Sequence, residues 1–178
     1  MNRALDTRIL AESAVMISLS AVLFMVKLYV YPQGGEVTLG SMVPILLLSL
    51  RRGARVGLVS GVLFSFIVLY LEPFVYYPAQ GVLDYPLAFG SLGIAGLLRH
   101  QGLRGALAGT ALGIGARFLC HFVSGIVFFV SYVPIGMDPY IYSAIYNASY
   151  LLPELAISAT VITVLVKRGM LDTEARKI

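Results

Sequence analysis

Six long apolar runs, separated by short charged or Gly/Pro-rich segments, constrain the fold of this chain more than any other feature. The runs lie near 8–30, 37–50, 53–71, 80–99, 104–131 and 148–167. A helix of about 20 apolar residues matches the thickness of the hydrocarbon core of a bilayer. The second run is short for a complete crossing. The pattern predicts an all-α integral membrane protein with six transmembrane helices in a single domain.

The composition supports a membrane location. Of the 178 residues, 58% are hydrophobic and only 12% are charged, whereas about a quarter of the residues in soluble domains are charged. Six spans with short loops leave no length for a soluble catalytic domain. The run 8–30 resembles a signal peptide but is too long, lacks a small-residue cleavage site and is followed by further spans. We therefore expect it to form the first helix.

The basic residues gather at one set of span ends, in the two tails and in the turns 51–55 and 99–104. They are Arg3, Arg8, Arg51, Arg52, Arg55, Arg99, Arg104, Lys167, Arg168, Arg176 and Lys177. The opposite loops carry Glu36, Glu72 and Asp138 and no Lys or Arg. The positive-inside rule then predicts a multi-pass protein of the cytoplasmic membrane with both termini cytoplasmic. Because aromatic residues do not alternate with the basic ones, we expect no nucleic-acid partner.

Several ionisable side chains lie inside the predicted spans, where they are costly and normally face a partner or a cavity. At about 1.5 Å per helical residue, Arg117 and Glu154 come to nearly the same depth. We therefore expect them to form a buried ion pair between the fifth and sixth helices. His121 follows Arg117 by one turn on the same face. Asp84 and Asn147 also fall in the outer third of the membrane.

Asp84, His121 and Asn147 are thus expected to converge beneath outer loops rich in Tyr, Pro and Gly. A carboxylate, an imidazole, an amide and aromatic rings suit a small, flat, cationic ligand. The tyrosines also fit an interfacial aromatic belt, and a lone histidine on a helix is more often structural. The shared depth of the three polar residues favours a binding site. The loops 31–40 and 72–81 are then expected to act as lids.

The first helix carries small residues at spacings of three and four, including Ala14 and Ser18. Such a face lets another helix approach closely. It fits either packing within the bundle or docking of another membrane subunit.

The sequence offers little for catalysis or cofactor binding. It contains no Walker A loop, and two histidines with one cysteine make no metal cluster. Ser124 lies three residues after His121, but no nucleophile elbow or orienting acid accompanies the pair. We therefore expect no enzyme, no metal and no cofactor.

Four segments together resemble the thiamine-specific substrate-binding (S) component of energy-coupling factor (ECF) transporters, over nearly the whole chain. They are PQGGEVTLGSMVPILLLSLRRG (32–53), GVLDYPLAF (81–89), RFLCHFVSGIVFF (117–129) and YSAIYNASYLLPE (142–154). The resemblance implies a six-helix bundle that binds thiamine near the outer face. It also implies delivery together with a transmembrane coupling subunit and two ATP-binding-cassette ATPases, which hydrolyse the ATP.

The resemblance assigns roles to individual residues. The ligand-binding positions of the family match Asp84, Tyr85, His121, Phe129, Tyr142 and Asn147. The face that meets the coupling subunit resembles Ala14 and Ser18. Two departures stand out, because family members use tryptophans around the ligand and a glutamate before Tyr-Pro. This chain has no tryptophan and carries Asp84, so the acid is shorter and Phe129 offers a weaker cation–π face.

Three alternatives remain open at the level of the sequence. The chain could be an S component for another vitamin or for a thiamine precursor such as hydroxymethylpyrimidine. It could be a stand-alone secondary transporter, which the lack of an obvious internal repeat disfavours. An intramembrane enzyme would require turnover that depends on His121.

Overall fold

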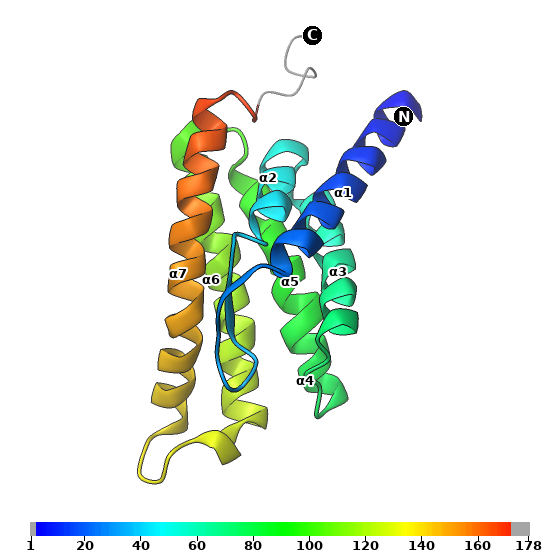
Figure 1. Cartoon of the computed structure of the whole chain (residues 1–178). Coiled ribbons are helices and arrows are strands. Elements are labelled where there is room, and N and C mark those ends of the chain that lie inside the picture. The colour runs from blue at the N-terminus through cyan, green and yellow to red at the C-terminus, as the bar shows by residue number, and fades with distance from the viewer. Residues whose placement is uncertain (1–2, 172–178) are drawn as a thin grey trace.

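The computed structural model describes residues 3–171, which form a helical bundle with one small β-hairpin (Figure 1). The elements in chain order are α1 Arg3–Phe24, β1 Lys27–Val30, β2 Glu36–Thr38, α2 Val43–Arg52, α3 Ala54–Leu71, α4 Pro78–Val82, the π-helix η1 Leu83–Leu87, α5 Ala88–Gly90, the 3-10 helix η2 Ser91–Leu98, α6 Gly102–Phe128, the 3-10 helix η3 Val130–Tyr132 and α7 Pro139–Lys167. The elements α4 to η2 follow one another without a break and act as one long helical segment.

Five helical segments of the described residues are long and apolar enough to cross a membrane. They are Thr7–Phe24, Ala54–Leu71, Pro78–Leu98, Gly102–Phe128 and Pro139–Lys167. Three of them agree closely with the predicted runs 53–71, 80–99 and 104–131. The chain is therefore a multi-pass membrane protein, while the count of six spans stays a prediction.

The region between α1 and α3 departs most from the expected helices. α1 ends at Phe24, and β1 pairs with β2 in an antiparallel hairpin, with Tyr29 opposite Val37. The turn between the strands contains Gly34 at φ 86°, a backbone conformation that favours glycine. The predictions that 27–30 continue the first helix and that 37–38 begin the second are therefore wrong.

α2 is a buried helix that is too short to cross a bilayer by itself. Its 10 residues rise only about 15 Å, half the hydrocarbon thickness. Its residues from Val43 to Leu50 are all buried, and it lies among the other helices (Figure 1). The hairpin completes this part of the bundle. Non-helical backbone within the depth of the membrane is tolerated where other protein segments cover it or where it lines a cavity.

The last helix begins at Pro139, nine residues earlier than the predicted run 148–167. The carboxylate of Asp138 caps it, accepting hydrogen bonds from the backbone N–H groups of Tyr140 (2.8 Å) and Ile141 (3.1 Å). Pro139 occupies the first helical position, where no N–H is needed. Tyr142 and Asn147 therefore lie within the helix and not at its entrance.

Backbone-to-backbone contact joins α3 to the segment 78–98. A Cβ atom on Gly93 would lie 2.4 Å from the backbone nitrogen of Leu58, and one on Gly61 would lie 2.3 Å from the carbonyl oxygen of Phe89. Close approach through small residues is the usual way for helices to pack in membranes. This contact sets the position of η1, which carries Asp84.

α1 leans against the bundle and is the least buried of the long helices (Figure 1). Its Glu12 pairs with Arg51 (2.9 Å) and with Nε of Arg52 (2.7 Å), both at the end of α2. Ala14 and Ser18 are exposed on its surface. Of the small residues on this helix, Ala14 and Ser18 are therefore accessible, whereas Ala21 packs against the core.

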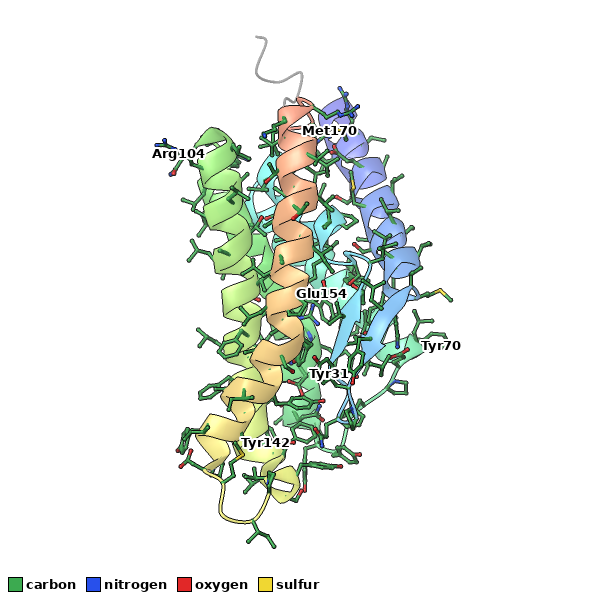
Figure 2. All side chains as sticks on the ribbon, turned by 60° about the vertical axis from the view of Figure 1, so that its left-hand side comes forward. Tyr31, Tyr70, Arg104, Tyr142, Glu154 and Met170 are labelled. Carbon is green, nitrogen blue, oxygen red and sulfur yellow. The ribbon has the colours of Figure 1, made fainter. Side chains whose placement is uncertain are left out.

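The two ends of the bundle differ in charge. Arg104 and Met170 lie at the upper end in Figure 2, where α1 also begins, and Tyr31 and Tyr142 lie in the lower half. The turns that contain Arg51, Arg52, Arg55 and Arg99 belong to the upper end as well (Figure 1). Arg176 and Lys177 lie outside the described residues. The cytoplasmic location of both termini stays a prediction.

Candidate ligand-binding site

A cavity of about 260 Å³ opens at the half of the bundle that is remote from the basic turns. Its walls come from the hairpin, the loop that follows α3, η1, α6 and α7. All six ligand-binding positions predicted from the sequence line it: Asp84, Tyr85, His121, Phe129, Tyr142 and Asn147. A cavity of this size suits a small organic molecule.

Asp84 is the polar centre of the cavity. Its Oδ1 lies 3.0 Å from Nδ1 of His121, and its Oδ2 accepts hydrogen bonds from Nε2 of Gln80 (2.7 Å) and Oγ of Ser124 (2.8 Å). Asp84 and His121 are each only 13% exposed. The π-helical turn of η1, which contains Pro86, directs Asp84 toward α6. The predicted convergence of Asp84 and His121 is therefore confirmed.

Asn147 reaches the same cluster from α7. Its Nδ2 donates to the carbonyl oxygens of Ser143 (2.9 Å) and His121 (3.3 Å), and its Oδ1 accepts from the hydroxyl of Tyr150 (2.6 Å). The amide therefore links α7 to α6 at the level of His121. It also borders the cavity, as predicted.

The predicted ion pair between Arg117 and Glu154 is absent from the residues 3–171. Nε of Arg117 donates to Nε2 of His121 (3.2 Å), and its guanidinium lies 4.0 Å from the ring centre of Phe89. Glu154 instead accepts hydrogen bonds from the backbone N–H and the hydroxyl of Thr38 in β2. The hairpin, which the apolar pattern did not predict, supplies the partner of Glu154.

Aromatic rings form the wall of the cavity near its mouth. Phe129 stacks on Phe74, with ring centres 5.9 Å apart and an interplanar angle of 15°. Tyr142 stacks on Tyr146 in the same way, at 6.0 Å and 23°. These rings come from the loop after α3, from the end of α6 and from the first turns of α7. They offer flat surfaces to a flat ligand.

Two loops cover the cavity, in the places expected for lids. The hairpin is held to α7, because Tyr146 accepts a hydrogen bond from the backbone N–H of Gln33 (3.0 Å) and Tyr142 donates to the side-chain oxygen of Gln33 (3.2 Å). The loop after α3 is held by Tyr85, whose hydroxyl accepts from the N–H of Phe74 (2.8 Å) and donates to the carbonyl of Glu72 (2.9 Å). Tyr85 thus serves as an anchor for this loop.

A lysine joins the two lids. Lys27 of β1 pairs with Glu36 of β2 (2.8 Å) and with Glu72 at the end of α3. Burial raises the pKa of Glu36, and the nearby Lys27 only partly offsets this effect. Burial lowers the pKa of Lys27, but the two carboxylates outweigh burial and raise it overall. Glu36 and Glu72 line the cavity. In the sequence, each is the single acidic residue of its loop. This pattern alone did not predict that either residue lines the cavity.

Comparison with known proteins identifies the family. Residues 10–171 match the family described as Thiamine transporter protein (Thia_YuaJ). The chain belongs to this family. The match covers nearly all of the described residues and confirms the resemblance of the four segments noted above.

Individual relatives agree with this assignment. The chain is 34% identical to thiamine transporter ThiT of Bacillus subtilis (strain 168) over 176 residues, with 92% of the chain and 89% of the relative covered. It is 32% identical to thiamine transporter ThiT of Lacticaseibacillus paracasei over 153 residues, covering 77% and 73%. The solved structure of ThiT from Listeria monocytogenes has a TM-score of 0.84 at 23% identity, covering 96% and 99%. The last comparison establishes a shared fold.

Proposed function

We propose that this chain binds thiamine in the cavity and serves as the substrate-binding component of a thiamine importer. The observation that carries the proposal is the Asp84 carboxylate, which Gln80, Ser124 and His121 hold between η1 and α6 beside a stacked aromatic wall. A negative charge next to flat rings is complementary to a flat cation. Relatives that carry the name thiamine transporter support the choice of thiamine.

The chemistry of thiamine fits this arrangement. Its thiazolium ring is permanently positive, so no proton has to move on binding. Asp84 and Glu36 offset this charge, and their attraction to it is stronger in a poorly solvated cavity than in water. Phe129 and His121 offer ring faces. The aminopyrimidine presents neighbouring donor and acceptor atoms, which suit the hydroxyl and amide groups of Tyr142 and Asn147.

We further propose that transport requires partner subunits. The sequence has no Walker A loop with which to bind ATP, so the energy must come from elsewhere. The exposed face with Ala14 and Ser18 on α1 suits close docking of a transmembrane coupling subunit. Two ATP-binding-cassette ATPases would complete an ECF-type importer in the cytoplasmic membrane. The cavity would then face outward, opposite the basic turns.

Titration calorimetry of the detergent-purified protein tests the ligand. Thiamine, hydroxymethylpyrimidine and the thiazolium half of thiamine are titrated separately into the same preparation. We expect submicromolar binding of thiamine, which corresponds to more than about 8 kcal/mol, and much weaker binding of either half. Tighter binding of hydroxymethylpyrimidine would instead identify a component for a thiamine precursor. No heat with thiamine, from protein shown to be folded, would contradict the proposal.

Reconstitution tests the partners. Proteoliposomes that contain this chain alone should bind thiamine without accumulating it. Accumulation without any ATPase would contradict the S-component role and support a stand-alone secondary transporter.

A further inference from the structure

Both ring nitrogens of His121 are engaged by charged neighbours. Nε2 faces Nε of Arg117 at 3.2 Å, and Nδ1 faces Oδ1 of Asp84 at 3.0 Å. The guanidinium of arginine has N–H donors and no acceptor. Nε2 of His121 must therefore accept this hydrogen bond, which means that it carries no proton.

The other side of the ring fixes the remaining proton. A neutral imidazole has one N–H, so a bare Nε2 places the proton on Nδ1. Nδ1 then donates to Asp84, whose second oxygen already accepts from Gln80 and Ser124. All three neighbours of the Asp84 carboxylate are thus donors, which is the pattern of an ionised acid.

The other groups that face His121 do not compete for Nε2. Tyr150 of α7 meets the ring edge-on, with ring centres 6.2 Å apart, and its hydroxyl is bonded to Asn147. Asn147 itself contacts the backbone oxygen of His121. Glu36 borders the same cavity from β2 and pairs with Lys27. Within residues 3–171, Arg117 is thus the donor that meets Nε2.

We propose that Arg117 is a positioning residue that holds His121 as the neutral Nδ1–H tautomer. This inference deepens the proposed thiamine site, although its first test needs no ligand. With both nitrogens engaged, His121 presents only its ring faces to the cavity and contributes stacking to recognition. The ring also stays uncharged, so it does not oppose a cationic ligand.

A matched pair of variants isolates the hydrogen bond. In Arg117→Gln, the side-chain amide nitrogen stands the same number of bonds from the backbone as Nε of arginine and still donates. In Arg117→Met, a methyl group takes that place and donates nothing. Both variants lose the positive charge and the contact with the ring of Phe89. A difference between them therefore reports on the donor alone.

Nitrogen NMR of ring-labelled histidine reads the tautomer directly. The chain has only two histidines, so His100→Gln assigns the signals. We expect wild-type protein and Arg117→Gln to show a protonated Nδ1 and a bare Nε2 from about pH 7.5 to about pH 5.5, which spans the ordinary titration range of histidine. In Arg117→Met, Nε2 loses its donor, so a second proton should bind there at a higher pH than in Arg117→Gln, with Asp84 stabilising the doubly protonated ring.

Thiamine binding gives the second readout. The affinity of Arg117→Met should fall by about tenfold more than that of Arg117→Gln over the same pH range, since a charged ring opposes the thiazolium. A protonated Nε2 in the wild type, or identical pH behaviour of the two variants, would overturn the inference. If Arg117→Met does not fold, the wild-type and Arg117→Gln spectra still decide the tautomer. Failure of thiamine to bind any of these proteins would contradict the proposed function and leave the NMR result standing.

Discussion

At the scale of single residues, the charge of the cavity depends on carboxylates that are held in different ways. Asp84 contacts three polar side chains, those of Gln80, Ser124 and His121. Glu36 shares Lys27 with Glu72 at the junction of the two lids. Because burial raises the pKa of Glu36, this residue takes up a proton at a higher pH than an ordinary glutamate.

The raised pKa of Glu36 leads us to expect that thiamine binding depends on pH. A cationic ligand favours the ionised carboxylate, so thiamine affinity should fall as the pH decreases through the raised pKa of Glu36, above its ordinary 4.5. In Glu36→Gln, thiamine affinity at neutral pH should be up to about tenfold lower than in the wild type. The decrease of affinity through the pKa of Glu36 should be absent in this variant. Calorimetry across this pH range checks it. The same pH dependence in Glu36→Gln and wild type would show that Glu36 does not act on the ligand.

At the scale of elements, the regular helices were predictable from the sequence and the β-hairpin was not. The spans of α3 and α6 follow from long, mostly apolar runs, and a constant rise per residue placed Asp84 and His121 at similar depth. The residues of β1 and β2 continue neighbouring apolar runs, and a short apolar run does not distinguish strand from helix. Because the hairpin was not predicted, Thr38 was not considered as a partner of Glu154, and Arg117 was predicted instead.

The start of α7 carries a recognisable sequence signal. Asp138 followed by Pro139 is a typical helix start. The Tyr- and Pro-rich composition of 131–150 indicated a loop instead. Gln33, which binds both Tyr142 and Tyr146, could be assigned to the site only once the hairpin was known, because its contacts lie more than 100 residues away in sequence.

The contact between α3 and the segment 78–98 predicts which glycines tolerate a methyl group. Gly93→Ala should lower stability by about 1–3 kcal/mol, because its Cβ would meet the backbone of Leu58 at 2.4 Å. Gly115→Ala is the matched control, at an exposed position of α6 where nothing lies within 4 Å of the new Cβ. It should be neutral or stabilising by up to about 1 kcal/mol. Thermal unfolding in detergent measures both. Equal effects of the two changes would contradict the close packing.

At the scale of the whole molecule, the basic turns lie at one end of the bundle and the cavity lies in the other half, where Figure 2 labels its lining residue Tyr142. This separation fits the proposed import function, in which the ligand enters from one side and partner subunits supply energy at the other. The sequence indicated it through the position of its Lys and Arg residues alone. The positive-inside rule predicts the direction, with the cavity outside and the basic turns inside.

Cysteine labelling tests this orientation. In a background of Cys120→Ala, which removes the chain's one cysteine, Ile135→Cys places a thiol in the exposed loop before α7. Gln101→Cys places one in the exposed turn before α6. A membrane-impermeant maleimide should label position 135 in intact cells and position 101 only after permeabilisation. The reverse pattern would contradict the outward-facing cavity.

The most direct test of the central claim is the titration of thiamine into Asp84→Asn beside Asp138→Asn. Both variants replace an aspartate by its amide, but Asp84 lies in the cavity, whereas Asp138 caps α7, a role that asparagine fills equally well. We expect Asp84→Asn, still folded by its thermal transition, to bind thiamine at least about tenfold more weakly, or about 1.4 kcal/mol. Asp138→Asn should bind as the wild type does. Unchanged affinity in Asp84→Asn would contradict the claim that this cavity recognises the cation.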